Sequence, residues 1–89
     1  MVRLPLRRAP RPSSVVLVTR AGCHLCALAE PVVARAATDA GVPLEVRDVD
    51  ARPEDHDRWT DKVPVVLLDG VEHAYWSIDE QVLRKALRL

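Results

Sequence analysis

The sequence predicts an α/β domain in which a four-stranded mixed sheet is flanked by three helices. Short apolar runs rich in β-branched residues alternate with longer segments of helical periodicity, as expected for alternating strands and helices. The 89 residues are enough for one domain and leave no room for a second. A strand, a helix and a second strand fit within about 35 residues, which is the size of a βαβ unit with parallel strands. The expected order of elements is β-α-β-α-β-β-α.

The first strand is expected at residues 15–19, where Val-Val-Leu-Val-Thr is apolar and largely β-branched. A helix rich in Ala and Leu follows over residues 27–40 and should end at Gly41, because glycine favours helix termination. Pro31 lies inside this helix, so we expect a kink there.

The second strand is expected at residues 44–50, which alternate at first and close with acidic residues. A short helix should then run from Pro53 to about Asp61, since proline suits the first turn of a helix. Trp59 is its expected anchor in the core.

The third strand is expected at residues 63–68, where Pro64 is tolerated because it stands at the start. Asp69-Gly70 is a strong signal for a two-residue hairpin turn, so residues 71–76 should return as an antiparallel fourth strand. The S-x-x-E pattern of residues 77–80 is a capping box, which predicts the start of the last helix.

The charge balances at zero but is unevenly distributed. The first twelve residues carry four arginines, which leaves 9 basic against 13 acidic residues in the remainder. These arginines, three prolines and the lack of periodicity predict a flexible basic tail over residues 1–14, ahead of a folded domain at 15–89. The tail could bind an acidic partner, but a solvated extension without a role is the simpler expectation.

The mildly acidic body argues against nucleic-acid binding, and no apolar run is long enough to span a membrane. The basic N-terminus does not resemble a secretory signal, because three prolines interrupt it and no apolar segment follows. We therefore expect a cytoplasmic monomer.

Both cysteines lie in one short stretch, Arg20-Ala-Gly-Cys23-His-Leu-Cys26, between the first strand and the first helix. Cys23 should stand at the helix N-terminus, where unpaired N–H groups and the helix dipole favour a thiolate. Cys26 should lie one turn further on the same face, close enough for a disulfide. Arg20 adds a positive charge if the loop folds it back, and an imidazolium at His24 would act in the same direction.

Two other interpretations of the cysteines stay open. They could be inert buried thiols, or they could supply half of a zinc site. A self-contained zinc site is poorly supported, because no second Cys-x-x-Cys or His-x₃-His pair occurs. A Cys-x-x-Cys at a strand-to-helix turn in a reducing compartment favours redox chemistry over both.

Together with the element order, Cys23, Cys26 and the Val63-Pro64 pair make the chain resemble the thioredoxin fold, and within it the glutaredoxin-like proteins. The resemblance covers residues 15–89 and includes Pro31, which matches the kinking proline of thioredoxins. It implies that Cys23 is the nucleophile and Cys26 the resolving cysteine. It also implies that Pro64 is cis and that Val63 offers its backbone to a substrate disulfide.

The resemblance further implies roles for two charged residues in binding substrate. Arg20 stands where glutaredoxins place a basic residue three before the nucleophile, and Asp79 matches an acidic residue at the start of the last helix. Three departures are visible. Trp76-Ser77 replaces the Gly-Gly of glutaredoxins, His24-Leu25 separates the cysteines, and Leu17 replaces the buried acid of thioredoxins.

The expected function is that of a thiol–disulfide oxidoreductase, which reduces or exchanges disulfides through a mixed disulfide and contributes to cell redox homeostasis. Its substrate would be a disulfide-containing protein or a low-molecular-weight thiol, and no cofactor or metal is expected. Two alternatives are an iron–sulfur or zinc carrier, in which cysteines of two subunits hold the metal, and a non-catalytic binding module of the same fold.

Overall fold

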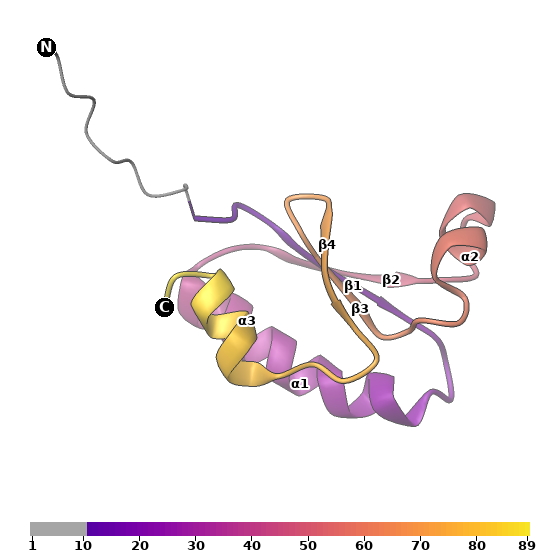
Figure 1. The fold of residues 1–89 in the computed structure, drawn as a ribbon, viewed down its shortest axis with the longest axis horizontal. Coiled ribbons are helices and arrows are strands. Elements are labelled where there is room, and N and C mark those ends of the chain that lie inside the picture. Colours follow the sequence, from indigo (N-terminus) through magenta and orange to yellow (C-terminus); the bar gives the residue numbers. More distant parts are fainter. Residues whose placement is uncertain (1–10) are drawn as a thin grey trace, which may run out of the picture.

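The computed structural model describes residues 11–89 and confirms the predicted fold class and order of elements (Figure 1). The elements are β1 (Val15–Thr19), α1 (His24–Ala40), β2 (Leu44–Asp48), α2 (Pro53–Trp59), β3 (Val65–Leu68), β4 (Val71–Tyr75) and α3 (Glu80–Ala86).

The strands form one mixed sheet in the order β2-β1-β3-β4. β1 is parallel to β2 and antiparallel to β3, and β3 and β4 form the predicted hairpin. The hairpin turn has positive φ at both Asp69 (51°) and Gly70 (81°), the conformation that fits the twist of a two-residue hairpin. Because β1 is a central strand, its residues 15–18 are all buried.

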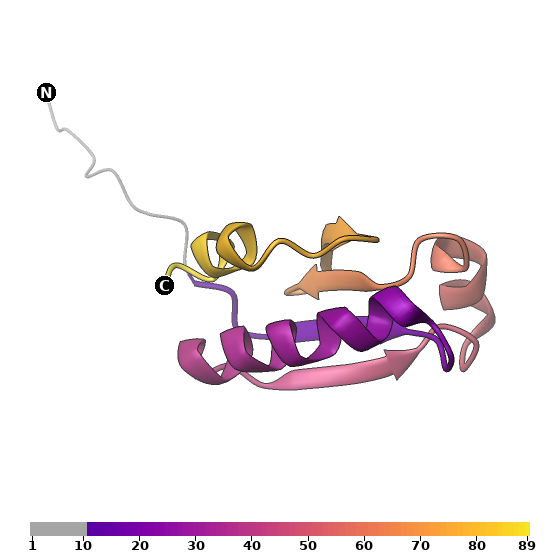
Figure 2. The same cartoon turned by 90° about the horizontal axis from the view of Figure 1, so that it is seen from below.

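Side chains that alternate along β1 and β3 build a core on each face of the sheet. Val15, Leu17 and Val66 pack with α1 and α3 on one face. Val16, Val18, Val65 and Leu67 pack with Val49 and Trp59 on the other, where α2 lies. Trp59 is 5% exposed, which confirms it as the anchor of α2. Figure 2 shows α1 and α3 as neighbouring rods along the sheet.

Gly41 ends α1 as predicted. It has φ +69°, and its N–H donates to the carbonyls of Ala37 and Thr38, which satisfies carbonyls that the last turn leaves free. Pro31 lies inside α1 on its exposed side.

The predicted capping box of the last helix is wrong. Asp79, not Ser77, caps α3, and its Oδ1 accepts the Val82 N–H at 3.0 Å. Before this helix, Trp76 has a left-handed backbone (φ +64°) and donates its N–H to the Pro64 carbonyl at 2.9 Å. The chain turns at Trp76, and α3 begins only at Glu80.

Three strand and helix ends differ from the prediction by about two residues. β2 ends at Asp48, whose Oδ1 accepts the Asp50 N–H at 2.8 Å and so turns the chain out of the sheet. α2 ends at Trp59, and β3 begins only after Pro64.

The expected flexible tail falls largely on residues 1–10, outside the described residues. Of its last residues, Ser13 and Ser14 donate their N–H groups to Asp69 Oδ1 at 2.8 and 3.1 Å. Within residues 11–89 no helix has the length and apolar character that a membrane crossing requires.

Candidate active site

Cys23 ends the turn between β1 and α1, and Cys26 lies in the first turn of α1, at the end of the molecule that also holds α2 (Figure 1). Gly22 takes φ +77°, a left-handed conformation that costs other residues energy. The Cys23 N–H donates to the Arg20 carbonyl at 3.2 Å and closes the turn. Cys23 is thereby held as the N-cap of α1, as the sequence predicted.

The two thiols occupy different environments. Cys23 is half-buried, and its Sγ accepts the Cys26 N–H at 3.2 Å, so the first turn of the helix supports negative charge on this sulfur. Cys26 is only 3% exposed. Burial, followed by the hydrogen bond with Cys23, raises the pKa of Cys26 to about 11. At neutral pH Cys26 is therefore a protonated, shielded thiol.

Val63 and Pro64 lie at the same end of the sheet as the cysteines. β1 and β3 are antiparallel, and Val65 at the start of β3 pairs with Val18 near the end of β1. The Val63–Pro64 peptide bond is cis, which confirms the expectation from the resemblance. Pro64 is buried and Val63 is half-buried.

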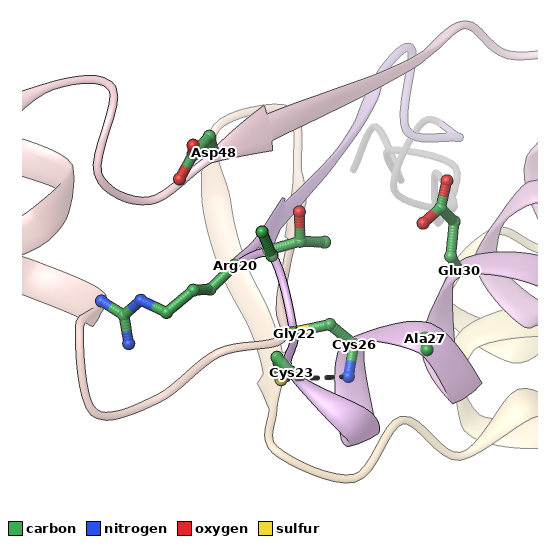
Figure 3. Close-up of a pocket in the computed structure, with 9 residues that line it drawn as sticks. Arg20, Gly22, Cys23, Cys26, Ala27, Glu30 and Asp48 are labelled. Atoms are coloured by element: carbon green, nitrogen blue, oxygen red, sulfur yellow. Dashed lines mark hydrogen bonds between the residues drawn. The ribbon is translucent and has the colours of Figure 1, made fainter.

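A cavity of about 390 Å³ opens beside the cysteines (Figure 3). Besides both cysteines, its lining includes two carboxylates, Glu30 from α1 and Asp48 from the end of β2. A second, more apolar groove of about 240 Å³ lies between α1 and the loop that follows β4. Its walls are Leu25, Leu28, Ala29, Val32, Trp76, Ser77 and Ile78.

The guanidinium of Arg20 points away from both cysteines (Figure 3). It forms an ion pair with Asp50 at 3.1 Å and hydrogen bonds with Thr60. The Arg20 guanidinium, together with a hydrogen bond from His56, lowers the pKa of Asp50 to about 2. Neither Asp50 nor Thr60 was a candidate from the sequence, which carries no local signal for a contact across 30 or 40 positions.

The other predicted residues are placed as follows. Asp79 caps α3 and is exposed, and His24 is exposed as the first residue of α1. The roles of Arg20 and Asp79 toward substrate stay predictions. Among residues 11–89 no cluster of three His, Cys, Asp or Glu side chains is arranged to hold a metal ion.

The sequence profile of the Glutaredoxin-like domain (DUF836) matches residues 14–88, nearly the whole described chain. The chain belongs to this glutaredoxin-like family. Its relatives include the uncharacterized proteins Rv0508 of Mycobacterium tuberculosis and Mb0520 of Mycobacterium bovis. Each is 40% identical over 75 residues, which cover 79% of this chain and 77% of the relative.

Solved structures show the same fold. Protein Ne2328 of Nitrosomonas europaea is similar with a TM-score of 0.68 and 24% identity, over 88% of this chain and 94% of that one. Protein XcR50 of X. campestris reaches a TM-score of 0.67 with 27% identity, over 83% and 95% of the two chains. Fasciola hepatica thioredoxin reaches 0.59 with 25% identity, over 84% and 77%. This glutaredoxin-like protein therefore has the thioredoxin fold.

The contrast between the thiols of this glutaredoxin-like protein predicts selective alkylation. Treating the reduced protein with iodoacetamide near pH 6 should label Cys23 well before Cys26, because Cys26 is buried and its pKa is raised to about 11. Peptide mass spectrometry over a time course measures both rates. Equal labelling of the two thiols, or faster labelling of Cys26, would contradict the assigned roles.

Proposed function

We propose that this protein is a thiol–disulfide oxidoreductase whose reactive group is the dithiol of Cys23 and Cys26. The observation that carries the proposal is the asymmetry of the pair. One sulfur caps the helix and accepts a backbone N–H, while the other is buried one turn inside. A nucleophile that is reachable and a resolving thiol that is shielded are what two-step disulfide exchange requires.

In the first step, the Cys23 thiolate attacks one sulfur of a substrate disulfide that lies along the backbone of Val63. A mixed disulfide forms, and the other substrate sulfur leaves as a thiolate and takes a proton from water. Pro64 has no N–H, so it contributes no donor that would compete with Val63 for the substrate backbone.

In the second step, Cys26 loses its proton and attacks Cys23 Sγ. A Cys23–Cys26 disulfide forms, and the second substrate sulfur leaves and is protonated. The substrate thus gains two electrons and two protons, and the dithiol loses them. An external thiol or dithiol reductant reverses the oxidation of the pair.

The proposal includes the setting expected from the sequence. The substrate is a disulfide-containing protein or a low-molecular-weight disulfide, and the protein acts as a cytoplasmic monomer without a cofactor.

A reduction assay tests the function. The purified protein, supplied with a dithiol reductant, should speed the reduction of a disulfide-bonded protein above the rate of the reductant alone, and should cycle between dithiol and Cys23–Cys26 disulfide. A coloured, dimeric preparation without such turnover would favour the metal or cluster carrier instead. A Cys23–Cys26 disulfide that cellular reductants cannot reach would favour the binding module.

A further inference from the structure

The side chain of Arg20 joins the active-site turn to two loops that are distant in the sequence. Its Nε and Nη2 donate to the two carboxylate oxygens of Asp50 at 3.1 and 3.2 Å. Its Nη1 and Nη2 donate to the backbone carbonyl and the hydroxyl of Thr60 at 2.9 and 2.7 Å. The planar fork of a guanidinium can make these four bonds at once, which the single ammonium of a lysine cannot.

The backbone of the same residue belongs to the cysteine turn, because the Arg20 carbonyl accepts the Cys23 N–H at 3.2 Å. Thr60 is the C-cap of α2 and stands three residues before Val63. Arg20 therefore connects the backbone beside the nucleophile with the start of residues 60–64, which we call the substrate-binding segment.

The rest of the substrate-binding segment is held by different contacts. Trp76 donates its N–H to the carbonyls of Lys62 and Pro64 at 3.2 and 2.9 Å, and its Nε1 to the carbonyl of Asp61 at 2.7 Å. Val65 then enters the sheet. At its start, the segment is also held to α2, because the Thr60 N–H donates to the His56 carbonyl at 3.0 Å and the Lys62 N–H to the Trp59 carbonyl at 2.8 Å. The Arg20 contacts add a direct connection from Thr60 to the cysteine turn.

The geometry argues against a second role, in which the Arg20 charge stabilises the Cys23 thiolate directly. The guanidinium points away from the cysteines (Figure 3), and Asp50, whose pKa is lowered to about 2, is ionised beside it at neutral pH. Although Arg20 lines the same cavity as the cysteines, its charge is the smallest of the influences on the pKa of Cys26, and Asp50 pairs with it.

We propose that Arg20 is a positioning residue, whose guanidinium, held by Asp50 and Thr60, fixes the substrate-binding segment beside Cys23. This inference rests on the proposed function, since it assigns Arg20 the task of presenting the backbone of Val63 to the substrate disulfide. Asp50 is then the anchor that holds the guanidinium in place.

Arg20→Lys tests the proposal, because it keeps the charge and loses the fork. We expect KM for a disulfide peptide to rise about tenfold, with a smaller change in kcat, because misplacing a binding segment by a fraction of an ångström weakens substrate capture. Arg20→Gln should raise KM as much and leave the pH midpoint of Cys23 alkylation where it is in the parent. Asp50→Ala should raise KM in the same direction although Arg20 is intact.

The matched control is Arg84→Gln, which removes an ion pair of 2.8 Å with Asp39 between α3 and α1. Its KM should equal that of the parent. The proposal is overturned if Arg20→Lys keeps the parent KM, or if Arg20→Gln shifts the alkylation midpoint while KM stays the same.

Amide hydrogen exchange tests the positioning without any turnover. In Arg20→Lys the amides of residues 61–63 should exchange about tenfold faster than in the parent, while those of α3 keep their rates. Unchanged exchange at residues 61–63 contradicts the proposal. If the parent reduces no disulfide, the proposed function fails, and the exchange result still decides whether Arg20 holds the segment.

Discussion

Replacing Cys23 with serine should reduce the disulfide-reductase rate to that of the reductant alone. Cys26→Ser should instead form a stable mixed disulfide through Cys23. Loss of Cys23 removes the nucleophile of the first step, whereas loss of Cys26 stops only the second. In the parent, Cys26 attacks the mixed disulfide within the same molecule, with an effective molarity of about 10⁵ M. External thiols at millimolar concentration cannot match this, so the mixed disulfide persists in Cys26→Ser. Intact-protein mass spectrometry after mixing with a disulfide peptide detects the adduct, and the adduct formed in cell extract identifies the substrate.

The double variant Cys23→Ser/Cys26→Ser is the control, since it should form no adduct at all. If Cys23→Ser forms the stable adduct through Cys26 while Cys26→Ser forms none, the order of the two cysteines in the proposed mechanism is reversed. Full turnover by Cys23→Ser would contradict the two-thiol mechanism itself.

Glutathione should be a poor reductant for this protein, and Trp76→Gly should raise glutathione-dependent turnover about tenfold, a difference of about 1.4 kcal/mol. By the resemblance to glutaredoxins, Trp76 stands where those proteins place the Gly-Gly pair against which the glutathione backbone lies. Its indole is half exposed, lines the apolar groove beside α1 and donates Nε1–H to the Asp61 carbonyl, so the ring lies along the segment that leads to Val63. Removing the ring opens this approach. The segment stays held, because the bonds from residue 76 to the carbonyls of Lys62 and Pro64 come from the backbone N–H, which glycine keeps.

The variant should still fold, because glycine adopts the left-handed φ of +64° without the cost of about 1 kcal/mol that another residue meets there. Trp76→Phe serves as the control. It keeps an aromatic ring in place, so its glutathione-dependent turnover should stay as low as that of the parent. Robust glutathione turnover by the parent, with no gain in Trp76→Gly, would show that the ring does not block the approach.

Local patterns in the sequence were enough to predict the fold. The apolar run of residues 15–19, the Asp69-Gly70 turn and the glycine at position 41 each specify a backbone conformation through their nearest neighbours. The placement of Cys23 at a helix start follows in the same way, because it depends only on where β1 ends and α1 begins. The capping box predicted at residues 77–80 was wrong for the opposite reason. The Trp76 N–H donates to the carbonyls of Lys62 and Pro64, which are distant in the sequence, and the chain turns there before the helix begins.

The sequence by itself therefore determined the order of elements, the pairing of the cysteines on one helix turn and the cis proline that the family resemblance implied. Only the tertiary structure decided the direction in which Arg20 points, because its partners Asp50 and Thr60 are 30 and 40 residues away and meet it only when α2 packs beside the end of β1. The same holds for Trp76, whose left-handed backbone and contact with Asp61 arise where the end of β4 meets the loop before β3. Charged and aromatic side chains on loops contact residues that are distant in the sequence, and a short stretch of sequence does not predict these contacts.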